Sequence, residues 1–172
     1  MILHGLQGLH RDYVVQNQGF LRKLWMSLNS SDHVLLGFDL KKDVKVLTAA
    51  YNDSSGHTKD FNLNLLKRIN NELGGNFNTD KFQHLGVYSP ILGAMESYVL
   101  ATEEQDVYIA KLERSFHFDA FEPIHLEYSF KFLKSDIEYL SQKTGFEVIA
   151  HFSDPKNYFS DSLWKVVKEN DS

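Results

Sequence analysis

The clearest hydrophobic pattern in the chain is a strict alternation over residues 122–132, EPIHLEYSFKF. One side carries the apolar residues Ile124, Leu126, Tyr128 and Phe130, and the other carries the polar residues His125, Glu127, Ser129 and Lys131. A period of two predicts a half-buried β-strand, in which side chains of one face repeat about every 7 Å. The polar face thus aligns a carboxylate, a hydroxyl and an ammonium. Both a solvated face and a ligand-binding face fit this arrangement.

The N-terminal part combines a helical repeat with one buried strand. Apolar residues recur at helical spacing at Phe20, Leu21, Leu24, Trp25 and Leu28. This spacing predicts a helix that ends at the turn residues 29–32. The continuous apolar run VLLGF at 34–38 predicts a strand buried on both faces. Polar residues follow at 39–43, at the end of a strand where ligands bind in open α/β sheets.

Two helices are predicted next in the chain. The first covers residues 44–51, and the loop NDSSG at 52–56 separates it from the second. The apolar stripe of the second helix consists of Phe61, Leu65, Ile69 and Leu73, and the helix stops at Gly74. Its polar face carries asparagines at positions 62, 64, 70 and 71. Because asparagine is a poor helix former, these residues favour either ligand contacts or a solvated face.

From Tyr88 onward the period changes to two. Alternation at 95–100, 107–112, 116–118 and 122–132 predicts strands joined by short turns, as in an antiparallel meander. The motif SDIE at 135–138 predicts a capping box, in which Ser135 caps a helix that ends at Gly145. Strands at 146–150 and 161–167 follow, with a turn at 154–155.

The order of these elements predicts an α/β fold: helix, buried strand, helical excursion, antiparallel insert, helix and two strands. It resembles the second half of a doubly wound sheet that is interrupted by an inserted lobe. The strand at 34–38 has the pattern of an interior strand, and in such a half sheet its usual neighbours on one side would be missing. Since an unpaired apolar edge recruits other chains, we expect a homo-oligomer or strand exchange through this edge.

Composition narrows the classes of function. The chain has 172 residues, and 42% of them are hydrophobic, which is enough for a core. Its net charge is −5, and it has no cluster of basic residues of the kind that binds nucleic acid. No apolar run is long enough to cross a membrane, and the first residues do not resemble a signal peptide. The absence of cysteine excludes thiol catalysis and fits a cytoplasmic location. The eight histidines have no ligand spacing, so no metal site is expected.

Several stretches together resemble a known family. They are LLGFDLKKD at 35–43, AYND at 50–53, GHTKDFN at 56–62, LKRINNELG at 66–74, FQH at 82–84 and LEYSFK at 126–131. In this order and spacing, over residues 20–167, they resemble the C-terminal part of the histidine-specific, S-adenosylmethionine-dependent N-alpha-methyltransferases of ergothioneine biosynthesis.

The resemblance implies a partial Rossmann-like methyltransferase domain at 1–50 and 132–172 and a substrate-binding lobe at 51–131. Tyr51 matches the family tyrosine that holds the polar backbone end of the amino acid. Glu127 and Ser129 match the pair that reads the imidazole ring, and Thr58 and Phe61 match pocket-lining positions. The implied substrate is histidine or a related amino acid, and the implied methyl donor is S-adenosylmethionine.

These residue types suit the implied task. A neutral imidazole has one donor and one acceptor nitrogen, so the Glu127 carboxylate can accept from one and the Ser129 hydroxyl can satisfy the other. The implied reaction is an in-line displacement, in which the substrate's α-amine attacks the sulfonium methyl group. Positioning and preorganised polar groups would supply most of the acceleration, without a protein nucleophile. Lys131 is expected to form a structural ion pair or to anchor a loop, and not to act as a catalytic base.

The chain also departs from the family pattern. The Gly-rich turn and the acidic residue that hold the cofactor in the family have no counterpart here, and no residue of the stretch 5–13 is assigned the role of a substrate-binding asparagine. We therefore expect this chain alone to be inactive and not to bind S-adenosylmethionine in the family manner. It would be a fragment, a shortened gene product or one piece of a complex. The alternative is a non-catalytic ligand-binding or interaction module.

Overall fold

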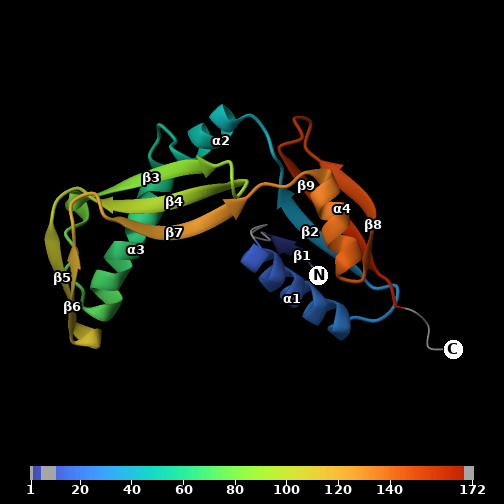
Figure 1. Ribbon diagram of the computed structural model, residues 1–172, viewed down its shortest axis with the longest axis horizontal. Helices are drawn as coiled ribbons and strands as arrows, with labels where there is room; N and C mark the ends of the chain where they lie inside the picture. Colours follow the sequence, from blue (N-terminus) through green and yellow to red (C-terminus); the bar gives the residue numbers. More distant parts are fainter. Residues whose placement is uncertain (1, 5–10, 169–172) are drawn as a thin grey trace. The chain divides into compact units, whose positions relative to one another are not determined.

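The computed structural model describes residues 2–4 and 11–168 (Figure 1). Part of the stretch 5–13, namely residues 5–10, lies outside the described residues. The elements in order are β1 (Ile2–His4), α1 (Arg11–Ser27), β2 (His33–Asp39), α2 (Val44–Tyr51), α3 (His57–Leu73), η1 (Thr79–Lys81), β3 (Phe82–Ser89), β4 (Ala94–Ala101), β5 (Gln105–Ile109), η2 (Ala110–Leu112), β6 (Arg114–Phe118), β7 (Pro123–Phe130), α4 (Lys134–Lys143), β8 (Phe146–Ser153) and β9 (Phe159–Val166).

The chain forms two compact units. Unit 1 contains residues 1–43, 89–94 and 129–172, and unit 2 contains residues 44–88 and 95–128. Unit 1 holds a sheet with the strand order β1-β2-β9-β8, in which β1 and β2 are parallel and β9 is antiparallel to both of its neighbours. Mixed α/β structure with antiparallel pairing is therefore observed, as the predicted fold class required.

Aromatic side chains form the core of unit 1 around the buried strand β2. Phe38 of β2 is fully buried and lies 5.8 Å from the Trp164 ring and 5.1 Å from the Phe132 ring. Val34 and Leu36 are also fully buried. Each fully buried aliphatic side chain contributes roughly 1.5–3 kcal/mol. The strand predicted at 34–38 is confirmed, and its apolar run is explained by burial.

The predicted unpaired edge of this strand is wrong. On one side β2 pairs with β9 along its whole length, from His33 to Asp39. On the other side β1 pairs with Leu35, Leu36 and Gly37 in parallel register. The terminal strands of this sheet are therefore β1 and β8. The sequence pattern missed β1 because three residues are too few to show a period.

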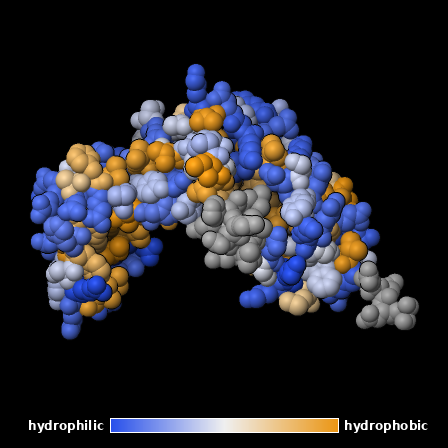
Figure 2. Space-filling view, in the orientation of Figure 1, coloured by the Kyte–Doolittle hydropathy of each residue, from blue (hydrophilic) through white to orange (hydrophobic). Residues whose placement is uncertain are grey.

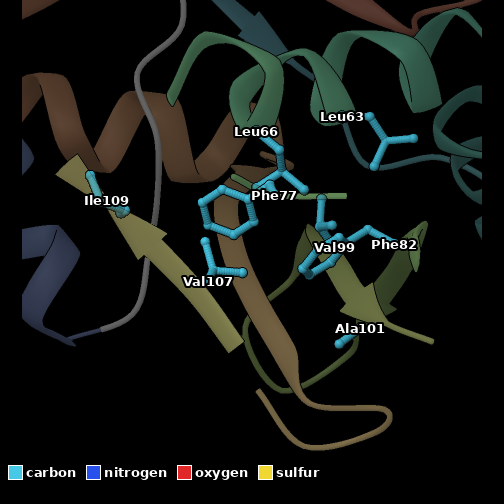
Figure 3. Packing of buried hydrophobic residues seen from close by; sticks show 8 residues of the cluster. All are labelled: Leu63, Leu66, Phe77, Phe82, Val99, Ala101, Val107 and Ile109. Carbon is cyan, nitrogen blue, oxygen red and sulfur yellow. The ribbon is translucent and has the colours of Figure 1, made fainter. Parts of the chain in front are cut away.

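The core of unit 2 lies between α3 and its strands. Its buried residues are Leu63, Leu66, Phe77, Phe82, Val99, Ala101, Val107 and Ile109. Figure 3 shows Leu63 and Leu66 of α3 pointing toward the side chains of the strands. This packing stabilises α3, because a helix in a protein depends on burial of one face more than on its intrinsic propensity.

The strands of unit 2 do not form the predicted meander. They divide into a sheet with the order β3-β4-β7 and a separate antiparallel hairpin of β5 and β6. Two backbone hydrogen bonds explain the break: Ala101 N–H donates to Glu122 O, and Phe121 N–H donates to Ala101 O. They return the chain to the end of β4, so the intervening hairpin leaves the sheet. Strand β3 was also not predicted.

The predicted apolar stripe of α3 is only partly the buried one. Phe61 and Leu65 have 74% and 39% of their surface exposed, whereas Asn62 is buried together with Leu63 and Leu66. The buried arc is thus shifted by about one position along the helix. The helix stops as predicted at Gly74, which adopts a left-handed conformation with φ of 65°.

Helix α4 begins before the predicted capping box. Its N-cap is Leu133, and the carboxylate of Asp136 accepts a hydrogen bond from the Leu133 N–H at 2.8 Å. Ser135 is therefore inside the helix and is not its cap. Asp136 satisfies one of the backbone donors that helix starts leave unpaired.

Polar and apolar residues are mixed on the surface that Figure 2 shows. Figure 2 shows a mostly hydrophilic face in which hydrophobic residues occur as separate groups. Of the helices that the structure describes, none combines the length and the apolar composition needed to cross a bilayer.

We expect Gly145→Ala to destabilise unit 1 by about 2 kcal/mol or more, because Gly145 has φ of +89° and an added Cβ would lie 2.5 Å from Trp25 Nε1. Gly19→Ala is the matched control, because a Cβ there meets nothing within 4 Å inside helix α1. It should be neutral or stabilising by up to about 1 kcal/mol. Urea unfolding followed by tryptophan fluorescence reports on unit 1, since both tryptophans, Trp25 and Trp164, lie there. Equal effects of the two substitutions would contradict this explanation.

Helix α3 should lose stability at acidic pH through Asp53. The N–H groups of Thr58 and His57 hydrogen-bond to its carboxylate and lower the pKa of Asp53 to about 2. Because the folded-state pKa lies below the unfolded value near 3.8, this stabilisation is present above about pH 4 and disappears as the pH falls through 2. Carbon-detected NMR titration measures the pKa directly, with Asp60 of the same helix as the internal comparison.

Candidate functional site

A groove in unit 2 runs along one face of α3 beside β7. It encloses about 210 Å³ and is lined by Phe61, Asn62, Asn64, Leu65, Arg68, Leu126 and Glu127. Four of the α3 residues, at positions 61, 64, 65 and 68, have the spacing of a single helix face. The groove is smaller than the usual range for drug-sized ligands, roughly 300–1,000 Å³, and suits a ligand of amino-acid size.

Two of the predicted site residues, Phe61 and Glu127, line this same groove. Phe61 leaves most of its ring exposed, with 74% of its surface accessible. Glu127 is half-buried, and one of its carboxylate oxygens accepts a long hydrogen bond of 3.4 Å from the Ser97 hydroxyl. A carboxylate has about four acceptor sites, so Glu127 retains capacity for a ligand. The groove therefore offers an aromatic face and a carboxylate.

Strand β7 does not keep the strict alternation that the sequence predicted. The rings of His125 and Tyr128 lie 4.0 Å apart, although a regular strand would place them on opposite faces. The consecutive residues Leu126 and Glu127 both line the groove. This is the effect that a β-bulge has on a strand, because one extra residue re-aims the side chains beyond it. The alternation had predicted that Glu127 and His125 share a face of the strand. In the structure they do not.

A second cluster in unit 2 buries a carboxylate that the sequence did not single out. Glu96 is only 9% exposed and accepts a short hydrogen bond from the Tyr98 hydroxyl. That hydrogen bond, together with burial, raises the pKa of Tyr98 to about 12. The Tyr98 ring packs edge-on against His125 at 5.1 Å, and His125 packs against Tyr128. In the sequence both polar residues looked like ordinary members of an alternating strand.

Tyr51 ends helix α2, and its backbone is fixed from two sides. His84 Nε2 lies 2.8 Å from the Tyr51 carbonyl oxygen. A Cβ on Gly86 would lie 2.9 Å from the Tyr51 Cβ, so only glycine permits this close approach of β3. Asn52 completes the clamp, because its amide group donates to Gly86 O and accepts from Gly86 N–H at 2.9 and 3.1 Å.

Thr58 lies at the start of helix α3. Its backbone N–H donates to Asp53 at 2.9 Å, and its hydroxyl donates to the Ala50 carbonyl at 3.4 Å. These contacts tie the loop between α2 and α3 to both helices. Thr58 does not belong to the residues that line the groove, and its backbone N–H is one of the helix-start donors that the Asp53 carboxylate satisfies.

Ser129 belongs to unit 1, where its hydroxyl accepts a hydrogen bond from Lys131 Nζ at 2.8 Å. Lys131 is buried and also donates to Asp39 at 2.7 Å. Lys42 lies 2.7 Å from the other oxygen of Asp39 and donates to Tyr158 O at 2.9 Å. The prediction of a structural ion pair for Lys131 is confirmed. A buried lysine of this kind requires such partners, because an unpaired buried charge is very costly.

Arg68 is the groove residue that sequence reasoning missed. Its guanidinium makes two hydrogen bonds with Glu72, of 3.0 and 3.2 Å, which raise the pKa of Arg68 and lower that of Glu72. Both side chains are more than half exposed, so the pair contributes little to stability. Its position four residues after Asn64 was the available signal, since both fall on the face that also carries Phe61.

Among the side chains of residues 18–168, no group of three or more histidines and carboxylates is arranged to hold a metal ion.

Comparison with known proteins gives one family. A family model described as histidine-specific methyltransferase, SAM-dependent, matches residues 13–166. The chain is 33% identical over 144 residues to the histidine N-alpha-methyltransferase of Mycolicibacterium smegmatis and 34% identical over 144 residues to that of Mycobacterium tuberculosis. Each alignment covers 84% of this chain and 45% of the relative. The chain thus spans about half the length of these relatives.

Two weaker similarities are also found. The chain is 28% identical over 134 residues to ergothioneine biosynthesis protein 1 of Schizosaccharomyces pombe, covering 77% of this chain and 17% of that protein. A solved S-adenosylmethionine-dependent methyltransferase from Clostridium acetobutylicum superposes with a TM-score of 0.44 at 8% identity, over 90% of this chain and 52% of that one. The family model covers most of the chain, from Tyr13 to Val166. The chain therefore belongs to the histidine-specific, S-adenosylmethionine-dependent methyltransferase family.

Proposed function

We propose that this chain supplies the amino-acid-binding part of a histidine N-alpha-methyltransferase, and that the groove beside α3 receives the imidazole side chain. One observation carries the proposal: Phe61 and Glu127, far apart in the sequence, line the same groove. The mycobacterial relatives are histidine N-alpha-methyltransferases. Binding of histidine or a close analogue is the activity that these residues support best.

The groove matches the chemistry of an imidazole. The ring has an N–H donor, which the Glu127 carboxylate can accept, and an aromatic face, which can pack on the exposed ring of Phe61. The apolar side chains Leu65 and Leu126 add to the lining, and the polar side chains Asn62, Asn64 and Arg68 make up the rest of it. Apolar contact area combined with polar groups that can fix a ligand's orientation is typical of small-molecule sites.

The remaining predicted residues keep distinct proposed roles. Tyr51 would hold the polar backbone end of the amino acid, and the clamp on its backbone would fix the direction of the side chain. The Ser129 oxygen already accepts from Lys131, so its own proton remains for donation to an acceptor nitrogen. Thr58 would support the pocket indirectly, because its contacts with Asp53 and Ala50 order the loop that follows Tyr51.

The described residues do not fit the methyl donor in an obvious way. The parallel strand β2 ends at Asp39, the position where an acidic residue could accept ribose hydroxyls. One Asp39 oxygen instead accepts a hydrogen bond from Lys131, and the other forms an ion pair with Lys42 at 2.7 Å. We therefore assign no residue of this chain to S-adenosylmethionine and derive no step through it.

The finer description of the fold is part of the same proposal. Residues 1–50 and 132–172 would form part of a Rossmann-like methyltransferase domain, and residues 51–131 would form the substrate lobe. The support comes from the sheet β1-β2-β9-β8 in unit 1 and from the groove in unit 2. A longer protein that also contained a cofactor-binding strand and Gly-rich turn should methylate the α-amine of histidine.

A non-catalytic module is the second candidate. Its support is the charge pairing at Asp39, which occupies the acidic group nearest to the end of β2. The two candidates differ in one experiment: addition of a separately expressed cofactor-binding half from a family member. Methyl transfer to histidine in the mixture supports the enzyme, and ligand binding without any transfer supports the module.

Glu127→Gln is expected to weaken histidine binding by about 10-fold or more, because it removes a charge-assisted hydrogen bond to the imidazole. Phe61→Ala should weaken it by about threefold or more through loss of ring contact. Glu113→Gln, an exposed carboxylate of the same unit, is the control and should leave affinity unchanged. Isothermal titration with histidine measures all three. Unchanged affinity in Glu127→Gln would contradict the proposed role of the groove.

Self-association remains a prediction, but not through β2, because both edges of this strand are paired. Among the described residues, the outer strands of the sheet in unit 1 are β1 and β8. Terminal strands present unpaired backbone groups that can pair with a second chain. Small-angle scattering over a concentration series should show a dimer or larger species. A monodisperse monomer at high concentration would overturn the prediction.

A further inference from the structure

A chain of hydrogen bonds in unit 2 connects the groove to the backbone of Tyr51. Asn62 lines the groove, yet only 4% of its surface is exposed. Its amide nitrogen lies 3.0 Å from His84 Nδ1, and His84 Nε2 lies 2.8 Å from the Tyr51 carbonyl oxygen. Helix α3, strand β3 and the end of α2 are thus joined through one imidazole.

The Tyr51 carbonyl determines which atom donates in each of the two hydrogen bonds that His84 makes. A carbonyl oxygen only accepts, so His84 Nε2 must carry the proton and donate. In the neutral ring Nδ1 is then an acceptor, and the Asn62 amide must present its NH₂ group to it. The orientation of the Asn62 amide follows from a backbone atom on another element.

This orientation leaves the Asn62 carbonyl oxygen as the second polar end of the amide. No hydrogen bond to this oxygen is found among the described residues, and Asn62 is one of the groove's lining residues. The neighbouring Asn64 also lines the groove but is exposed on the surface of α3 and has no such partner in β3. The two asparagines therefore differ in preorganisation.

We propose that Asn62 and His84 form a positioning relay, in which His84 holds Tyr51 and orients Asn62 so that its amide oxygen accepts an N–H of the ligand in the groove. This inference rests on the proposed function, because the ligand is taken to be histidine or a close analogue. The relay makes His84 a positioning residue and Asn62 a binding residue beside Glu127. An acceptor held in place before binding costs less to order than a free side chain.

The first test needs no ligand. Nitrogen-15 NMR of the histidine side chains should show His84 as the neutral tautomer with the proton on Nε2. The tautomer with the proton on Nδ1 would overturn the relay, because Asn62 would then have to present its oxygen to His84. This measurement is independent of whether the chain binds histidine.

The second test separates Asn62 from its neighbour in titrations of the chain with histidine. Asn62→Ala should weaken binding by about 10-fold, and the matched variant Asn64→Ala by less than about twofold, because only Asn62 is preorganised. Equal losses would overturn the binding role of Asn62. Since Asn62 is buried, thermal melts of both variants accompany the titration, and Asn62→Asp, which retains an oxygen acceptor, should bind more tightly than Asn62→Ala.

The third test asks whether His84 acts through Tyr51 and Asn62. His84→Ala should weaken histidine binding by about fivefold in the parent chain and by less than about 1.5-fold in a background that carries both Tyr51→Ala and Asn62→Ala, since residues of one network are not additive. His84→Gln should recover most of the affinity, because its amide has one donor and one acceptor end. Additive losses, or no recovery by glutamine, would overturn the positioning role. A parent chain that does not bind histidine at any concentration would overturn the proposed function and the binding role of Asn62 together, whereas the His84 tautomer alone decides the relay.

Discussion

The candidate site depends on which arc of helix α3 is buried. Leu63 and Leu66 pack into the core of unit 2, and each of these burials is worth roughly 1.5–3 kcal/mol. Once they point inward, the face that carries Phe61, Asn64, Leu65 and Arg68 is left beside β7 as the wall of the groove. A rotation of the helix by one residue, about 100°, would bury Phe61 and remove the aromatic wall. The site is thus a by-product of core packing on the neighbouring arc.

Hydrogen bonds then fix the orientation of individual groups, which apolar burial cannot do because it has no preferred direction. Asn52, His84 and Asp53 each bond to backbone groups, and together they order the segment from the end of α2 to the start of α3. This segment carries Tyr51 and Thr58. Such contacts order the segment in advance, whereas a loop without them would keep conformational entropy that any ligand would have to remove on binding. The close approach at Gly86 adds a steric limit to the same clamp.

Unit 1 shows the same separation between packing and charge. Its aromatic core of Phe38, Phe132 and Trp164 stabilises the sheet by burial, which is not directional. The buried Lys131 joins the end of β2 to the segment after β7 through Asp39 and Ser129. A buried ion pair of this kind contributes little net stability, because the cost of removing both charges from water offsets much of their attraction. Its main effect is to fix which residues of the two segments lie opposite each other. It also leaves Asp39 neutralised by two lysines, which argues against a cofactor role for this carboxylate.

The sequence by itself determined the elements with a strong hydrophobic pattern, namely β2, α2, the extent of α3 and the last two strands. Its matching stretches also determined the family. The signals of these elements are local, because burial on one or two faces and glycine stops are written into consecutive residues. Only the tertiary structure decided the pairing of β1 with β2, the departure of the β5–β6 hairpin from the sheet and the break of alternation between His125 and Tyr128. It also decided that Phe61 faces the groove, and that Asn62, which looked like one of several asparagines on a polar face, is a buried partner of His84. These features depend on contacts between residues distant in sequence, and a helix or strand period cannot specify which of two neighbouring arcs another element will cover.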